Sequence, residues 1–272
     1  MLMPDPSYFH WNVDPVIVQL GPLALRWYGL LFATGFVLGF YFMRYVFQRE
    51  RKPEADLDKL LLYMLAGTIV GARLGHCFFY NPGYFLANPL EILAVHKGGL
   101  ASHGGAIGIF IALYFYSKNR PKQPYLWVID RIAVATALAG SLIRLANFFN
   151  SEILGIPTDV PWAVVFERID DLPRHPSMLY ESISYLFIWG VLFTLYRKLG
   201  SRTPHGLLLG LFLIFVFTAR FLIEFVKESH ADFVQYIPFE LHMGQVLSIP
   251  MVLIGVYLVA RALPQLRTAT SG

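Results

Sequence analysis

Charged residues are scarce in this chain of 272 amino acids. Asp, Glu, Lys and Arg together make up 15% of it, whereas an average soluble domain has roughly 25%. Hydrophobic residues make up 56%, and the mean hydropathy is +0.52. A globular core cannot enclose this much apolar surface, so most of the molecular surface must face lipid. The composition excludes an ordinary soluble domain and predicts an integral membrane protein.

Cysteine is almost absent, because Cys77 is the only one in the chain. A disulfide framework and a cysteine-rich metal site are therefore excluded. Cys77 lies in an apolar run, where packing is a better interpretation than a nucleophile, which needs electropositive and accessible surroundings. The histidines show no metal-ligand spacing. We expect no metal and no organic cofactor.

Basic residues are missing where two other kinds of function would need them. Met1–Gly21 contains no Lys or Arg, so it does not resemble a cleavable signal peptide. The net charge is +4, but the basic residues fall in short loops rather than on one face of a soluble domain. Nucleic acid is therefore not an expected partner.

Long apolar runs, in contrast, fill most of the chain. A spanning helix needs about 20 mainly apolar residues, and the candidate spans are Leu23–Phe47, Leu57–Tyr80, Leu100–Ser117, Leu126–Phe149, Met178–Leu199, Gly206–Val226 and Met243–Leu263. One half of the chain does not repeat the other. The predicted fold class is an all-α integral membrane protein with seven transmembrane helices, in a single polytopic domain over residues 1–272.

The Lys and Arg residues between these spans predict the orientation. One side carries Arg44, Arg49, Arg51, Lys52, Lys59, Lys118, Arg120, Lys122, Arg197, Lys198, Arg202, Arg261 and Arg267, and the other carries only Lys97, Arg168, Arg174 and Lys227. The N-terminus is therefore expected outside and the C-terminus inside. The outer segment 150–177 places four prolines around the apolar run Trp162–Phe166. This pattern predicts a small ordered cap with a short strand.

Ionisable side chains inside the apolar spans are costly and by default mark a site. With a rise of about 1.5 Å per residue, Arg144 lies roughly 27 Å, Arg73 roughly 24 Å and Arg220 roughly 21 Å from the inner ends of their helices. His103 lies about one turn below the outer surface, and Tyr28 about 8 Å below it. The sequence therefore predicts that these side chains converge in the outer half of the bilayer.

Some of these charges also allow a structural interpretation. Arg220 and Glu224 are four residues apart on one helix face and could form a buried ion pair. Arg73 is equally consistent with a clamp on helix ends and with a site residue. Arg131 lies near the inner end of its helix, where its side chain is expected to reach the membrane surface.

A glycine-rich segment, Gly98–Gly108, surrounds His103. Gly104 and Gly108 form a small-xxx-small pair, which is typical of close helix packing. Packing does not require a histidine within the motif. We therefore favour a functional role for His103 over that of a helix-start residue.

Residues Ile143–Gly155 resemble the signature G-R-x-G/A-N-F-x-N-x-E-x-x-G of the prolipoprotein diacylglyceryl transferases. Further motifs match that family in order along nearly the whole chain: Trp27-Tyr28-Gly29, Gly71-Ala72-Arg73-Leu74-Gly75, His103-Gly104-Gly105, His175-Pro176-Ser177-Met178-Leu179-Tyr180-Glu181, Arg220-Phe221-Leu222-Ile223-Glu224-Phe225 and the run from Met243 to Met251. The charged and amide positions all match. Ile143, Met178 and Val216 depart from the family's usual Gly, Gln and Tyr.

The resemblance implies an enzyme of the bacterial cytoplasmic (inner) membrane, with a periplasmic N-terminus and a cytoplasmic C-terminus. It would transfer the diacylglyceryl group of phosphatidylglycerol to the lipobox cysteine in the signal peptide of a prolipoprotein. A thioether forms and glycerol phosphate leaves, in the first step of lipoprotein maturation. The expected partners are phosphatidylglycerol, such signal peptides and the surrounding membrane lipid.

This chemistry needs a thiolate and cations where phosphate charge develops. Arginine suits the second task because its planar fork grips phosphate oxygens in pairs. Arg144 and Arg220 are the expected phosphate clamps, and His103 the base or the group that orients the thiol. Tyr28 and Asn147 would hydrogen-bond the lipid headgroup.

The remaining predicted site residues support these groups. Glu152 and Glu224 would orient the arginines and balance their charge, and Gly155 would let the chain turn sharply below the cap. Gly104 would allow the close approach of lipid or peptide, and Arg73 completes the predicted substrate-binding set.

Two other classes of function remain open at this point. Intramembrane Arg, Glu and His residues also line transport paths, although transporters usually have repeated halves and a site at the midplane. A phospholipid hydrolase would use similar arginines but would activate water instead of a thiol. The products formed from phosphatidylglycerol and a lipobox peptide would distinguish the three.

Overall fold

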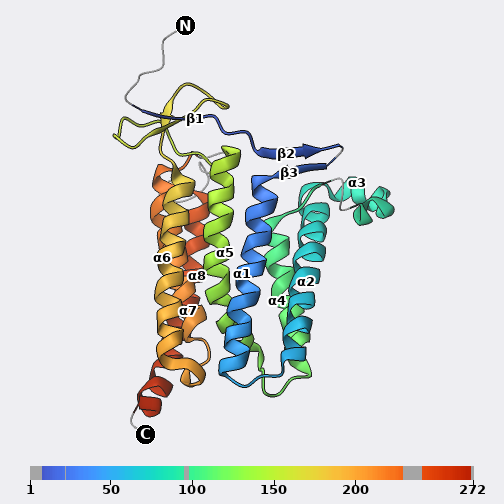
Figure 1. Cartoon of the computed structure of the whole chain (residues 1–272), viewed down its shortest axis with the longest axis vertical. Helices are drawn as coiled ribbons and strands as arrows, with labels where there is room; N and C mark the ends of the chain where they lie inside the picture. Colours follow the sequence, from blue (N-terminus) through green and yellow to red (C-terminus); the bar gives the residue numbers. More distant parts are fainter. Residues whose placement is uncertain (1–7, 22, 95–97, 229–240, 271–272) are drawn as a thin grey trace. The chain divides into compact units, whose positions relative to one another are not determined.

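A computed structural model describes residues 8–21, 23–94, 98–228 and 241–270, which are mainly helical (Figure 1). They form two compact units: Met1–Phe42 with Ile132–Gly272, and Met43–Arg131. The boundary between the units falls within α1 (Trp27–Arg49) and within α5 (Tyr125–Asn150). The prediction of a single domain over 1–272 remains a prediction.

Six helices in the described part of the chain are long and apolar enough to cross a membrane. They comprise α1, α2 (Glu54–Tyr80), α5, α6 (Ser177–Leu199) with the short helix η3 (Gly200–Arg202), α7 (Leu207–Ile223) with η4 (Glu224–Val226), and α8 (Met243–Thr270). Each overlaps one predicted span, and most of the helix ends lie within a few residues of the predicted ends. The chain is therefore a multi-pass membrane protein.

The remaining predicted span, Leu100–Ser117, corresponds to α4 (Ser102–Lys118), which has 17 residues. The backbone before it cannot extend the helix, because Gly98 and Gly99 have φ angles of 83° and 74° and Ala101 is extended. These conformations belong to turns rather than helices. The crossing of the membrane by α4 remains a prediction.

The start of the first predicted span was wrong. Leu23–Arg26 forms the strand β3, which pairs antiparallel with β2 (Val16–Leu20), and α1 begins only at Trp27. Gly21 supplies the positive φ of 59° that the turn between the strands requires. The apolar run from Leu23 concealed this hairpin, which leads directly into α1 in Figure 1.

The cap segment 150–177 contains the short strand predicted there. This strand, β4 (Val164–Phe166), pairs parallel with β1 (Phe9–Trp11) and antiparallel with β5 (Pro173–Arg174). Buried side chains under the sheet form a small core: Phe148, Leu154, Val164, Phe166 and Met178. The fold is therefore mainly helical, and five short strands among the described residues correct the all-α prediction.

Neighbouring helices of the first unit are fixed by small and polar groups. The hydroxyl of Ser141 on α5 donates to the carbonyl of Ser182 on α6 at 2.8 Å, and Ser182 returns a bond to Ser141 at 2.9 Å. The helices α7 and α8 approach closely at Gly210 and Gly255, where a Cβ would meet the facing backbone oxygen at 2.9 and 2.7 Å. Such contacts are typical of helix packing in membranes.

In the second unit, α2 and α4 pack through glycines. A Cβ at Gly75 would lie 2.6 Å from the Cα of Gly104, and Gly71 is equally closed by the backbone of Gly104. Cys77 is fully buried and free. The unit also contains the short helices α3 (Pro82–Ala87) and η1 (Pro89–Leu93).

The prediction that Arg131 reaches the membrane surface was wrong. Its side chain is 0% exposed and forms ion pairs of 3.2 Å with Glu50 and with Asp130. The indole of Trp127 also donates to Glu50, at 2.7 Å. Arg131 is therefore neutralised inside the protein rather than by water at the surface.

Candidate functional site

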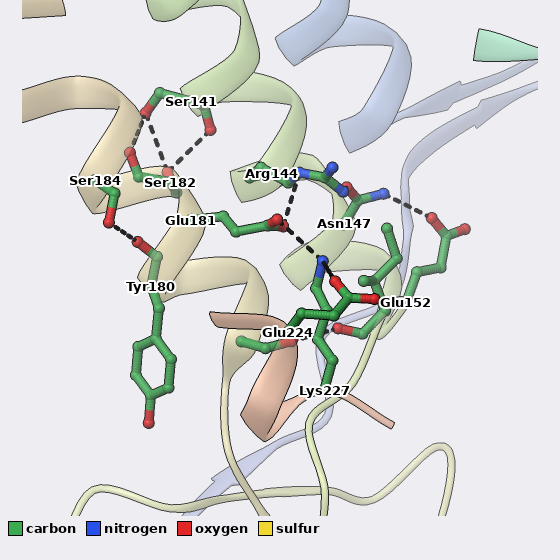
Figure 2. A network of polar contacts seen from close by, with 12 residues as sticks. Ser141, Arg144, Asn147, Glu152, Tyr180, Glu181, Ser182, Ser184, Glu224 and Lys227 are labelled. Atoms are coloured by element: carbon green, nitrogen blue, oxygen red, sulfur yellow. Dashed lines mark hydrogen bonds and ion pairs between the residues drawn. The ribbon is translucent and has the colours of Figure 1, made fainter. Parts of the chain in front are cut away.

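The centre of the candidate site is a buried ion pair between two helices. Nε of Arg144, on α5, lies 2.9 Å from Oε2 of Glu181, on α6 (Figure 2). Ser141 lies one turn before Arg144, and Ser182 directly follows Glu181. The reciprocal hydrogen bonds between these two serines bring Arg144 and Glu181 face to face. Glu181 is 0% exposed, whereas the Arg144 side chain keeps 15% exposure. The open side of this pair is therefore the arginine.

A second cation shares the same carboxylate. Nζ of Lys227 lies 3.0 Å from Oε1 of Glu181 and 3.5 Å from Oε2 of Glu224. Lys227 follows η4, and an isolated β-bridge with Gly155 fixes its backbone. The two carboxylates and the two cations form one chain of contacts in Figure 2.

The amide of Asn147 connects Arg144 to the beginning of the cap segment. Its oxygen accepts a bond of 3.4 Å from Nη1 of Arg144, and its nitrogen donates at 3.0 Å to Glu152. Asn150 also donates to Glu152 at 3.0 Å. Glu152 therefore orients Asn147 directly and Arg144 only through it, which corrects the predicted contact with the arginines.

Arg220, on α7, belongs to the same group of charges. Its guanidinium interacts electrostatically with Tyr185, Glu181 and Glu224. Tyr185 in turn interacts with both Arg220 and Arg144. The structure thus brings the two predicted phosphate clamps to a shared pair of partners. The ion pair of Glu224, however, is with Lys227 rather than with Arg220.

Tyr28 lies in the first turn of α1, directly after the hairpin. Its phenol interacts electrostatically with Glu152 and with Arg144. The neighbouring Trp27 stacks on Phe149 of α5, with ring centroids 4.5 Å apart. This packing holds the start of α1 beside the end of α5 and keeps Tyr28 at the candidate site.

Gly155 has a different role from the predicted sharp turn. A Cβ there would lie 2.5 Å from the carbonyl of His175 and 2.7 Å from that of Val226, so glycine allows two chain segments to close around it. The positive φ angles lie earlier, at Ser151 (55°) and Ile153 (59°). Gly155 thereby fixes the segment that carries Lys227.

The second unit holds the other predicted site residues. His103 is exposed in the first turn of α4. Gly104, next to it, is buried against Gly71 and Gly75 of α2, and this close helix packing explains why a glycine stands there. That His103 meets Arg144 and Arg220 stays a prediction.

Arg73 is committed to the backbone of its own unit. Its guanidinium donates to four carbonyls, those of Glu91 (2.6 Å), Ile92 (2.9 Å), Gly98 (2.6 Å) and Gly99 (3.2 Å). These bonds join η1 to Gly98 and Gly99, which precede α4. The geometry favours the structural alternative for Arg73, and its contact with substrate stays a prediction.

Carboxylates in the candidate site are paired with cations or amides. Among the residues that the structure describes, no group of three His, Cys, Asp or Glu side chains is placed to hold a metal ion. The arrangement can hold an anion, because the Arg144 guanidinium keeps an exposed side among carboxylates that are already paired. An arginine with free N–H groups is suited to phosphate oxygens.

Comparison with known proteins agrees with this geometry. A family model described as prolipoprotein diacylglyceryl transferase matches residues 15–261. The chain belongs to the prolipoprotein diacylglyceryl transferase family. It is similar to the phosphatidylglycerol–prolipoprotein diacylglyceryl transferase of Chloroherpeton thalassium, with 54% identity over 263 residues that cover 97% of each chain.

Two further relatives carry the same name. The protein from Tolumonas auensis is 50% identical over 91% of this chain and 95% of its own, and that from Bacteroides fragilis is 42% identical over 91% and 93%. The family membership identifies a membrane transferase of lipoprotein biosynthesis. Neither the hydrolase nor the transporter is favoured.

The sequence interpretation assigned no role to three residues of the candidate site. Glu181 was noted only as part of a motif, Lys227 only as a loop charge, and Tyr185 not at all. Glu181 carried a usable signal, because it is an ionisable residue in the first turn and a half of an apolar span. Lys227 could be inferred only from the fold, since its approach to Glu181 depends on how the chain closes around Gly155.

Proposed function

We propose that this chain transfers the diacylglyceryl group of phosphatidylglycerol to the lipobox cysteine of a prolipoprotein signal peptide. The cysteine sulfur attacks the glycerol carbon that carries the phosphate ester. The carbon–sulfur bond forms, the carbon–oxygen bond breaks, and glycerol phosphate leaves with the electron pair. The observation that carries the proposal is the open side of Arg144, which shares the partners Glu181 and Tyr185 with Arg220.

Phosphate binding by Arg144 is supported by its two contacts, which hold Nε against Glu181 and Nη1 against Asn147. Nη2 has no hydrogen-bond or ion-pair partner among the described residues, and together with the remaining N–H of Nη1 it can donate to phosphate oxygens. Arg220 adds a second cation where negative charge grows as the diester becomes a monoester. Tyr28 and Asn147 are the proposed hydrogen-bonding partners of the headgroup.

His103 is the proposed base, and its exposure at the start of α4 leaves the imidazole accessible to a peptide thiol. A neutral imidazole near a thiol of pKa about 8.5 assists thiolate formation. We keep Glu152, Glu224 and Gly155 in the site as supports of Asn147, Lys227 and the surrounding backbone.

The proposed topology has seven spans, in the inner membrane, with the N-terminus and the cap segment on the periplasmic side and the C-terminus in the cytoplasm. The charge bias between the loops supports this direction. The seventh span is α4, whose 17 residues carry no Asp, Glu, Lys or Arg before Lys118 and fall at the lower limit of a spanning helix.

The direct test supplies purified protein with phosphatidylglycerol and a synthetic lipobox peptide. We expect the mass of one diacylglyceryl group on the cysteine and an equal amount of glycerol phosphate. A peptide with serine in place of that cysteine is the control and should stay unmodified. Release of diacylglycerol without peptide modification would identify a hydrolase, and the absence of both products would reject an enzyme acting on these substrates.

His103 can be tested in the same assay. We expect His103→Gln to abolish transfer while leaving folded protein in the membrane, because glutamine keeps a similar shape but cannot accept the thiol proton. Near-normal transfer by this variant would remove His103 as the base.

A further inference from the structure

Glu181 is the most enclosed charge in the candidate site, and its position calls for an explanation. It is 0% exposed and contacts Arg144 at 2.9 Å through one oxygen and Lys227 at 3.0 Å through the other. Burying a carboxylate is strongly unfavourable unless opposite charges and hydrogen bonds compensate it. One carboxylate here serves cations from two separate parts of the chain (Figure 2).

Joining α5 to α6 does not require this charge. Ser141 and Ser182 already bond these helices in both directions, next to Glu181 in the sequence and in space. Gly140 adds close packing, because a Cβ there would lie 3.2 Å from the ring of Tyr185. A neutral residue at 181 would suffice for a purely structural contact.

The contact between Glu181 and Arg144 also has an unusual form. Although the two atoms are 2.9 Å apart, Oε2 of Glu181 makes no hydrogen bond of acceptable geometry with a described residue. Glu181 therefore holds the guanidinium in place by charge, while the directional hydrogen bond of Arg144 is the one from Nη1 to Asn147 at 3.4 Å. Together these two contacts fix which side of the guanidinium stays open to an anion.

The charges around Glu181 are nearly balanced. Arg144, Arg220 and Lys227 carry three positive charges, and Glu181, Glu224 and Glu152 carry three negative charges. In the proposed reaction the phosphodiester of the lipid becomes a phosphate monoester. The monoester is more negative than the diester, so a site with a positive excess would hold the product too tightly.

We propose that Glu181 is a positioning residue that aims the open edge of Arg144 at the lipid phosphate and limits the positive charge of the site, so that glycerol phosphate can leave. This inference rests on the proposed function. Glu181 acts through Arg144 and Lys227 and does not touch the reacting atoms.

Glu181→Gln tests the proposal because it keeps the side chain's size but removes its charge. We expect kcat to fall on the order of 10- to 100-fold, as for other residues that orient a site through a partner. The KM for phosphatidylglycerol should not rise, and glycerol phosphate should inhibit at about tenfold lower concentration, since one more positive charge faces it. Glu181→Asp keeps the charge and should restore part of kcat.

Ser182→Ala is the matched control, because it weakens the contact between α5 and α6 without changing any charge. A merely structural role predicts that Glu181→Gln and Ser182→Ala both lower thermal stability and leave kcat and product inhibition of the folded fraction unchanged. That result would overturn the proposal. If Glu181→Gln does not fold, Glu181→Asp decides, and wild-type kcat in this variant would overturn the proposal as well.

A binding measurement separates this inference from the proposed function. Glycerol phosphate alone should raise the thermal unfolding midpoint of Glu181→Gln more than that of the wild type, since a tighter ligand stabilises more. If wild-type protein forms no thioether, the proposed function fails, but this comparison still tests Glu181. Equal shifts in the two proteins would overturn the role of Glu181 even if the transfer reaction is observed.

Discussion

Arg131 and Arg144 lie on the same helix and are surrounded in opposite ways. Arg131 is 0% exposed between two carboxylates, and its partner Glu50 also accepts a bond from Trp127. Arg144 keeps 15% exposure and has one carboxylate, which it shares with Lys227. A buried arginine is therefore structural when its partners enclose it, and is available to a ligand when one edge is left open.

Arg73 extends this comparison. It also lies within a predicted span, but four backbone carbonyls occupy its donors. In the sequence all three arginines lie within predicted spans, and Arg73 and Arg144, unlike Arg131, also lie in motifs that resemble the transferase family. The structure distinguishes them by the partners of each guanidinium, and the following predictions test that distinction, from the largest expected effect to the smallest.

Replacing Arg131 should produce the largest loss of stability. Arg131→Met removes the cation that pairs with Glu50 and Asp130, and removing one partner of a buried ion pair typically costs about 3–5 kcal/mol. Thermal unfolding in detergent measures the change. The transferase activity of the protein that remains folded should be unaffected.

The double variant Arg131→Met with Glu50→Gln provides the control. Because the side chain at position 50 is then neutral, we expect the double variant to be more stable than Arg131→Met alone. If the double variant is less stable by the sum of both single effects, the two residues do not interact and the enclosure of Arg131 has no energetic meaning.

Replacing Arg144 should show the reverse pattern. Arg144→Ala is expected to lower kcat about 10²- to 10³-fold, comparable with the loss of one donor to a developing anion, and to change stability much less than Arg131→Met does. Arg144→Lys keeps the charge but loses the planar fork, so it should recover only part of the rate. Full turnover by Arg144→Ala would reject the phosphate clamp.

Replacing Arg73 distinguishes its two interpretations. Arg73→Gln removes most of the bonds to the carbonyls between Glu91 and Gly99, and the expected cost is about 1.5–3 kcal/mol. Amide hydrogen exchange should speed up in α3, η1 and the described residues before α4. An unchanged exchange rate together with a raised KM for phosphatidylglycerol would instead identify Arg73 as a substrate contact.

The sequence predicted the spans well because long apolar runs depend on local composition. It also predicted that Arg144 and Arg220 converge, since depth along a helix follows from residue count. It did not reveal Glu181 as their common partner, because the facing of α5 and α6 is fixed by Ser141 and Ser182, which leave no pattern in the sequence.

Other parts depended on contacts between residues far apart in the chain. The apolar segment Leu23–Arg26 resembles the start of a helix in the sequence. Only its pairing with β2 identifies it as a strand. The strand β1 has no local signal comparable with that of β4, with which it pairs. The sequence did not indicate the partner of Arg131, because Glu50 lies 81 residues earlier, directly after α1. Without that partner, the Arg131 side chain was expected to reach water.

The smallest expected effect lies in the cap, where a charge pair is partly open to water. Arg174 donates to the Asp170 carboxylate over distances of 2.6–3.2 Å, and these hydrogen bonds hold the pKa of Asp170 below its usual value. Because the folded-state pKa is lowered, the pair stabilises the fold above the unfolded-state pKa of about 3.9. This stabilisation is lost as the pH falls through the lower folded-state pKa.

Asp170→Asn should therefore lower the free energy of unfolding at neutral pH by less than about 1 kcal/mol, because Asp170 is 28% exposed and solvent screens such pairs. The difference from wild type should vanish in acid, below both pKa values, and the unfolding midpoint measured between about pH 2 and pH 7 would show this. Asp159→Asn, at an exposed position of the same segment, is the control and should show no such trend. A difference that grows on acidification would mean that Arg174 does not favour the charged form of Asp170. Arg174–Asp170 could then no longer serve as the weak, partly exposed ion pair in the comparison with the buried pairs of Arg131, which enclosure should make several times stronger.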